Sequence, residues 1–369
     1  MSKNNLAIFI RSSSQPIPRV LRMMRAAEKN GLKCEYFGAM RSKNLKRVDY
    51  YDNFKIHRLG FYVPLLNGKK ILLYFWFVLT FNISILINLL KLKPKIIHVS
   101  DFELFFSSKI YCFFYRKKLI YNIHDNLSQR YNIPKLLKNV LNFLEGVNVI
   151  LSDISIVPES FRKKSLPTWC QHKVQIVKNS PEDPKFHPKK MSNNKINIFF
   201  GGWIDEGRGL KKLISLSKQK NIQITVAGEG DKQIIKKLQS SESIEYLGFL
   251  THTEVINQTI MSDYVWALYD PSREINRFAA SNKIAEALAV GRPIIINKEL
   301  EVYNNLKKFN CLIPILYDDI EEYIVNDLKK VNQIKYQNLS ENCRKAFNAN
   351  YAWELIDEAQ DNIYKIILR

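Results

Sequence analysis

The chain has 369 residues, which exceeds the usual size of one hydrophobic core and makes two domains the expected organisation. Its 46% hydrophobic and 25% charged residues exclude a disordered protein. The formal net charge of +21 lies mostly in residues 1–120, where 22 Lys and Arg stand against 6 Asp and Glu, so we expect an anionic partner for this half, either a lipid surface or a nucleic acid.

The first elements alternate between strands and helices. Leu6–Ile10 predicts a buried strand, a helix follows from about Arg19 to Asn30, and another strand is expected near Cys34–Phe37. This βαβ opening predicts a parallel sheet. Further strands of the first half are expected at residues 96–99, 119–123, 149–151, 154–157 and 174–177.

Residues 71–90 contain no charged side chain over a length that could span a bilayer. Thr80, Ser84 and Asn88 recur at helical spacing and form a polar stripe. We therefore expect a helix that is partly buried against the sheet and partly inserted into a membrane interface, with a transmembrane helix as the alternative. Basic residues flank the segment on both sides, namely Lys69, Lys70, Lys91, Lys93 and Lys95.

A segment rich in proline and charge, residues 181–190, predicts a linker between domains at 1–180 and 191–350. A second series of strands is expected at residues 196–200, 222–227, 244–247, 264–268, 293–297 and 312–316. The five cysteines are scattered without a Cys-x-x-Cys pair, which is typical of reduced core thiols and not of a zinc site. The N-terminal strand is too short for a signal peptide, so we expect a cytoplasmic protein.

The most informative stretch is residues 282–296, in which Asn282 and Lys283 open a short helix that Gly291 ends. A helix N-terminus exposes unpaired N–H groups and a partial positive charge, so it can hold a phosphate. Glu286 lies one turn further, where a carboxylate can reach the hydroxyls of a sugar attached to that phosphate. This pattern resembles the donor site of nucleotide-sugar glycosyltransferases, and the chain is similar to their retaining, family 4-like branch.

The resemblance covers nearly the whole chain. It implies an α/β protein of the GT-B fold, in which two Rossmann-like parallel-sheet domains face a cleft and a C-terminal helix, here residues 351–369, crosses back to the first domain. It also implies a UDP- or GDP-linked sugar as co-substrate and no metal or other cofactor, since Arg208, Lys283 and the helix N-terminus would neutralise the diphosphate.

In the first domain the resemblance places an acceptor site at the strand ends. Arg11 and Ser13 follow the first strand, where the family often has glycines, and Asp101 follows the strand at 96–99. We expect these three residues to bind substrate. His124 and Asp125 follow the strand at 119–123, where the histidine can exchange a hydrogen bond with a sugar hydroxyl and the carboxylate can fix its tautomer or deprotonate an acceptor. We expect both to be catalytic, with a structural role as the alternative.

In the second domain Gly202 and Gly228 match family turns that let the backbone approach the donor diphosphate, and Arg208 supplies a cation beside it. Two departures stand out. Trp203 replaces a common arginine, and Phe278 replaces the first of two family glutamates. The donor-sugar contacts are then expected from Glu274, Asn276 and Arg277.

The predicted function is hexosyl transfer from a nucleoside diphosphate sugar to a lipid-linked or oligosaccharide acceptor in surface polysaccharide assembly, with retention, at the inner face of the cell membrane. A nucleotide-sugar epimerase on the same fold and an inactive scaffold are the alternatives within this fold. A basic nucleic-acid-binding protein would explain the charge, but we find no nucleic-acid motif and expect no such partner. The nucleotide, sugar, linkage and oligomeric state stay open.

Overall fold

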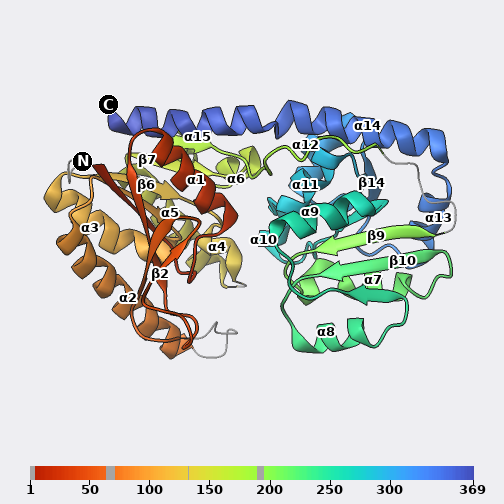
Figure 1. The fold of residues 1–369 in the computed structure, drawn as a ribbon, viewed down its shortest axis with the longest axis horizontal. Helices are drawn as coiled ribbons and strands as arrows, with labels where there is room; N and C mark the ends of the chain where they lie inside the picture. Colours follow the sequence, from red (N-terminus) through yellow and green to blue (C-terminus); the bar gives the residue numbers. More distant parts are fainter. Residues whose placement is uncertain (1–4, 64–70, 132, 189–194) are drawn as a thin grey trace. The chain divides into compact units, whose positions relative to one another are not determined.

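The computed structural model describes residues 5–63, 71–131, 133–188 and 195–369, and it divides into two compact α/β units (Figure 1). The first unit comprises Met1–Lys178 with Asp357–Arg369, and the second comprises Asn179–Ile356. The last helix thus contributes most of its length to the first unit.

The first unit contains an eight-stranded sheet of order β3-β4-β2-β1-β5-β6-β7-β8, which is parallel except for the β3–β4 hairpin at its edge. Its strands are β1 (Leu6–Ile10), β2 (Lys33–Ala39), β3 (Val48–Tyr51), β4 (Phe54–Leu59), β5 (Ile96–Ser100), β6 (Lys118–Asn122), β7 (Ile154–Val157) and β8 (Val174–Ile176). Its helices are α1 (Pro18–Lys29), α2 (Ile71–Leu92), α3 (Phe105–Tyr115), α4 (Leu127–Arg130), α5 (Lys135–Leu151), α6 (Ser160–Lys164) and α15 (Trp353–Leu368), with 3₁₀ turns at Phe102–Leu104 and Thr168–Lys173.

Side chains alternate between the two faces of this sheet. Ile8 and Ile97 pack in one core with the inner sides of α2, α3 and α5. On the other face the His98 ring stacks on Phe9 with centroids 4.8 Å apart, and its Nδ1 lies 3.1 Å from the hydroxyl of Tyr364 in α15. The C-terminal helix therefore packs on the first unit, as predicted.

Two predictions for this unit were wrong in detail. The sequence did not reveal the β3–β4 hairpin, whose turn places Asp52 and Asn53 in the left-handed region. Residues 149–151, expected as a strand, are the last turn of α5. A short apolar run of this kind fits a buried helix end as well as a strand, so its length alone does not decide between them.

Helix α2 has two apolar sides. Phe77, Phe81, Ile85 and Leu89 are almost fully buried in the core at a spacing of four residues. Thr80, Ser84 and Asn88, expected to form a polar stripe, turn their side chains back onto carbonyls of the preceding turn. The outward side is apolar and exposed, with Leu72, Phe75, Trp76, Leu79, Ile83, Ile87 and Leu90. By length and composition Leu72–Leu92 could span a membrane, at a mean hydropathy of 1.9.

The second unit contains a six-stranded parallel sheet of order β11-β10-β9-β12-β13-β14. Its strands are β9 (Ile196–Gly201), β10 (Ile222–Ala227), β11 (Ile244–Tyr246), β12 (Tyr264–Ala267), β13 (Ile294–Asn297) and β14 (Leu312–Ile315). Its helices are α7 (Leu210–Leu216), α8 (Lys232–Gln239), α9 (His252–Met261), α10 (Glu274–Arg277), α11 (Asn282–Val290), α12 (Glu301–Leu306), α13 (Glu321–Lys329) and α14 (Gln333–Asn350), with 3₁₀ turns at Glu206–Arg208 and Lys307–Phe309. Every strand expected in this half is present.

The expected linker at 181–190 belongs to the second unit as far as it is described. Asp183 pairs with the guanidinium of Arg344, and the carbonyl of His187 accepts from Arg292 at 2.7 Å. Residues 189 and 190 lie outside the described part. The proline and charge content of the segment predicted a linker, but Arg344 and Arg292 hold it against the second unit.

The two sides of α2 give a test of its place in the fold. Replacing Ile85 by Ala should lower the free energy of unfolding of the first unit by about 2–4 kcal/mol, because it leaves a cavity in the core. Ile83→Ala, on the outward side, should change stability by less than about 0.5 kcal/mol. Calorimetric melting of both variants measures the difference, and equal melting temperatures would contradict the packing of α2 on the sheet.

Candidate functional site

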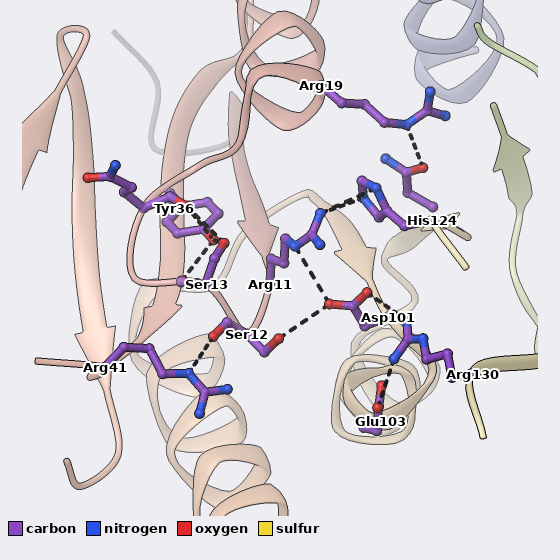
Figure 2. Close-up of polar contacts among 12 residues, drawn as sticks. Arg11, Ser12, Ser13, Arg19, Tyr36, Arg41, Asp101, Glu103, His124 and Arg130 are labelled. Carbon is purple, nitrogen blue, oxygen red and sulfur yellow. Dashed lines mark hydrogen bonds and ion pairs between the residues drawn. The ribbon is translucent and has the colours of Figure 1, made fainter. Parts of the chain in front are cut away.

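In the first unit three predicted residues gather where parallel strands end. Arg11 follows β1, Asp101 follows β5 and His124 comes two residues after β6, and these three strands are neighbours in the sheet (Figure 2). Because the carboxyl ends of parallel strands meet at one edge, the side chains that follow them are brought together. The structure therefore joins residues that are far apart in the sequence.

Arg11 and His124 make direct contact. One terminal nitrogen of the Arg11 guanidinium lies 3.3 Å from Nδ1 and 3.2 Å from Nε2 of the imidazole. Burial, reinforced by the positive charge of Arg11, holds the pKa of His124 well below its usual range. The ring is therefore neutral at physiological pH, so it can accept a hydrogen bond at one nitrogen and donate one from the other.

Asp101 joins the loop after β1 to helix α4, beside His124. Its carboxylate lies 3.2 Å from a guanidinium nitrogen of Arg130 and 3.7 Å from Nε of Arg11, and it accepts from the Ser12 hydroxyl at 3.4 Å. Its backbone has φ +76°, a region that costs energy for a residue other than glycine. The contacts hold this strained backbone in place, and strain of this kind is typical of functional sites.

Two predicted residues have other partners. The Asp125 carboxylate lies 2.9 Å from Arg162, and no hydrogen bond within the described part of the chain joins it to His124. Arg11 therefore occupies the place at the imidazole that the sequence assigned to Asp125. The Ser13 hydroxyl bonds that of the buried Tyr36 at 2.7 Å, so it closes the loop after β1 instead of facing outward.

In the second unit two glycine turns pack backbone against backbone. Gly202 and Gly228 have φ of +141° and +140°, and a Cβ on Gly228 would come within 1.8 Å of the Gly202 carbonyl oxygen. Only glycine fits this approach. The Nζ of Lys283 lies beside Gly202, 3.6 Å from where its Cβ would be.

Two basic side chains meet at the Tyr269 ring, and one of them, Lys283, lies beside Gly202. Lys283 Nζ lies 3.8 Å from the centroid of the Phe200 ring and 5.6 Å from that of Tyr269, and the Arg208 guanidinium lies 4.6 Å from the same Tyr269 ring. Burial and the nearby Arg208 hold the pKa of Lys283 well below its usual range. Arg208 also contacts the Asp205 carboxylate, at 3.3 Å. The pair offers an anion two donors, with Lys283 beside the exposed Gly202 backbone.

Glu286 is buried one turn into α11, and its carboxylate lies 3.2 Å from Nε2 of His252. His252 is the first residue of α9 and was not predicted. His252 follows the loop after β11, at the edge of the sheet where the other site residues gather. A histidine at that position is the signal that could have found it. At the start of α11, Asn282 is exposed and Ser281 makes no side-chain capping bond.

The residues expected to replace the missing glutamate lie in α10. Asn276 is buried and donates to the carbonyl of Asp270 at 3.0 Å, so it holds the loop. Glu274 is half-buried and Arg277 is exposed. Among the residues that the structure describes, no three His, Cys, Asp or Glu side chains group in a way that could hold a metal ion.

Solved structures share this fold, although no protein-family model and no curated protein sequence matches the chain. Sucrose-phosphate synthase from Thermosynechococcus elongatus superposes with a TM-score of 0.79 at 14% identity over 99% of both chains. Anabaena HepE in complex with UDP-glucose gives 0.68 at 12% identity over 98% of this chain and 99% of that one. The lipopolysaccharide outer core galactosyltransferase WaaB, in its apo form, gives 0.64 at 12% over 99% of both. The chain therefore has the two-domain GT-B fold that was predicted.

Proposed function

We propose that the protein is a glycosyltransferase that binds a nucleoside diphosphate sugar in its second unit and a glycan acceptor in its first. The observation that carries this proposal is the convergence of Lys283 and Arg208 on the Tyr269 ring, with Lys283 also beside the Gly202 backbone at the start of α11. A diphosphate placed there would meet two cations, free backbone N–H groups and a helix dipole. Glu286 lies one turn deeper, in reach of a ribose, with His252 orienting its carboxylate.

The nucleotide ligand of a similar structure supports the same chemistry, since HepE was solved with UDP-glucose. In the first unit the neutral His124 would contact the transferred sugar or the acceptor hydroxyl, while Arg11 fixes the position of its ring. Retention of configuration is proposed from the family that the chain resembles. A lipid-linked acceptor used in surface polysaccharide assembly is proposed from the lipid-facing surface described below.

Donor binding should depend on Glu286 and Arg208. Glu286→Ala and Arg208→Ala should each weaken UDP or GDP binding by about 1–3 kcal/mol, the scale of a charged hydrogen bond. Glu206→Ala is the matched control, since Glu206 is an exposed charge in the same loop as Arg208. Titration calorimetry measures all three, and unchanged affinity in both test variants would place the donor elsewhere.

His124 should act on turnover more than on donor affinity. His124→Ala should lower kcat by about 10²-fold or more with little change in nucleotide affinity, because a group that acts in the transition state affects the rate. Since its pKa is already lowered, the wild-type rate should show no titration of this residue near pH 6.5. A His124→Ala variant with full turnover would leave the ring only a packing role.

We further propose that the first unit binds peripherally to the anionic inner face of the cell membrane. Helices α2, α3 and α5 cover one face of its sheet, and Lys109 of α3 donates to the last carbonyl of α5 at 2.6 Å. We call their combined outer surface the docking face. It exposes the outward residues of α2 together with Phe106, Phe113 and Phe114 of α3 and Leu136, Val140 and Phe143 of α5.

The charge around the docking face selects an anionic bilayer as its occupant. Lys91, Lys93, Arg116 and Lys135 are exposed at the ends of the three helices. Each basic residue near an anionic leaflet contributes about 1 kcal/mol within a Debye length of roughly 8–10 Å. Exposed aromatic side chains such as Trp76 add interfacial burial. A soluble epimerase on the same fold would need neither feature.

Membrane binding should be reversible and sensitive to salt. The double variant Lys91→Glu with Lys135→Glu, and separately Trp76→Ser, should reduce sedimentation with phosphatidylglycerol vesicles, whereas Lys236→Glu with Lys237→Glu on α8 should not. High salt should release the wild-type protein. If detergent extracts the protein and high salt does not, α2 spans the bilayer. If the protein does not sediment with the vesicles at all, it does not bind the membrane.

A further inference from the structure

We propose that Arg11, Arg41 and Arg130 form a subsite for a phosphate or diphosphate group carried by the acceptor. The three guanidinium groups belong to one network around the loop after β1 (Figure 2). Arg41 donates from Nε to the Ser12 carbonyl at 3.0 Å, and the Ser12 hydroxyl donates to Asp101, which contacts the other two arginines. The inference rests on the proposed function, because it names the chemistry of that acceptor.

The charges of this network do not balance. Two carboxylates lie within it, and Arg130 contacts both of them, Asp101 at 3.2 Å and Glu103 at 3.1 Å. Arg11 reaches Asp101 only at 3.7 Å, and its other contact is a neutral imidazole. Within the described ranges no carboxylate lies within ion-pair distance of Arg41. The network therefore keeps one positive charge in excess, with Arg41 lacking a carboxylate within those ranges and Arg11 sharing Asp101 with Arg130. A planar guanidinium is well suited to phosphate.

The surroundings add positive charge. Arg19, on α1, donates to Asn122 at the end of β6, and burial together with Arg22 and Arg11 lowers its pKa to about 9. Burial is the main cause of this shift, and the two neighbouring guanidinium groups add to it. A pKa of about 9 leaves Arg19 charged at neutral pH, so it adds to the positive charge near Arg11.

The network is built onto α2. The Arg41 guanidinium lies 4.1 Å from the centroid of the Phe77 ring, and the Tyr74 hydroxyl donates to Glu103 at 2.7 Å. Asn82 also donates to the Glu103 carbonyl, at 2.9 Å. The subsite thus lies against the first half of α2, whose opposite side exposes Phe75 and Trp76. A phosphate at a membrane surface could reach the arginines while its lipid stays in the bilayer.

A soluble sugar phosphate would offer the arginines the same chemistry as a lipid-borne phosphate. The experiment therefore has two arms: the first tests whether the arginines bind diphosphate, and the second tests whether a lipid carries it. The first arm uses the full chain saturated with UDP, or with GDP where that nucleotide binds, so that the donor site is occupied. Inorganic diphosphate is then titrated by calorimetry. We expect saturable binding, which Arg41→Gln and Arg11→Gln each weaken by about tenfold or more, the scale of a charged hydrogen bond.

Arg25→Gln is the matched control. Arg25 pairs with Asp52, 2.7 Å away in the β3–β4 turn, at the opposite edge of the sheet, and this variant should bind as the wild type does. Arg41→Lys keeps the positive charge without the planar guanidinium, so it should bind diphosphate more tightly than a folded Arg41→Gln variant does. Absence of saturable diphosphate binding to the nucleotide-saturated wild type, or wild-type affinity in both glutamine variants, overturns the subsite. Failure of UDP and GDP to bind overturns the proposed function instead.

The second arm compares neutral phosphatidylcholine vesicles with the same vesicles containing a polyprenyl diphosphate. Stronger sedimentation with the polyprenyl diphosphate, lost in Arg41→Gln but kept in Arg25→Gln, supports the subsite with a lipid-borne phosphate. Diphosphate binding in the first arm without this gain supports the subsite with a soluble phosphorylated acceptor. Sedimentation that both variants reduce equally contradicts a specific role for Arg41.

Discussion

Parallel strand pairing is the constraint on which both candidate sites depend. It brings the carboxyl ends of neighbouring strands to one edge, so that loops distant in the sequence must share a small space. Arg11 meets His124 across 113 residues in this way. In the second unit the turns after β9 and β10 meet so closely that Gly202 and Gly228 touch through their backbones. The side chains supply the chemistry, and the sheet decides which of them can act together.

Helix α2 has two roles that different elements usually have: it completes the core, and it exposes an apolar surface. Its buried side completes the core of the first unit, and the same side carries the Phe77 and Tyr74 contacts that position the arginine network. Its outward side is apolar and exposed. A sheet-covering helix of an ordinary soluble domain would carry polar residues there. One element would therefore link the proposed membrane-binding surface to the proposed acceptor subsite.

The sequence predicted most where the signal is local. The alternation of strands and helices, the glycine turns and the spacing of Lys283 and Glu286 are each contained in a few residues. They predicted the fold, which is confirmed, and a donor site, which stays a prediction. Partners across the sheet could not be predicted in this way. Nothing near Asp125 in the chain indicates that Arg162 holds it, and nothing near His124 indicates Arg11. Arg41 stayed unnoticed because only the folded sheet shows its neighbours.

The buried Lys283 would couple the binding of a diphosphate at the proposed donor site to the uptake of a proton. Burial and the neighbouring Arg208 hold the pKa of this amine well below its usual range, so it loses its proton at a lower pH than an exposed lysine does. A bound diphosphate would favour the ammonium form, so binding would take up a proton from solution. Affinity for the anion would then rise as the medium becomes more acidic and fall as it becomes more alkaline. A product diphosphate would accordingly leave the proposed donor site more readily at higher pH.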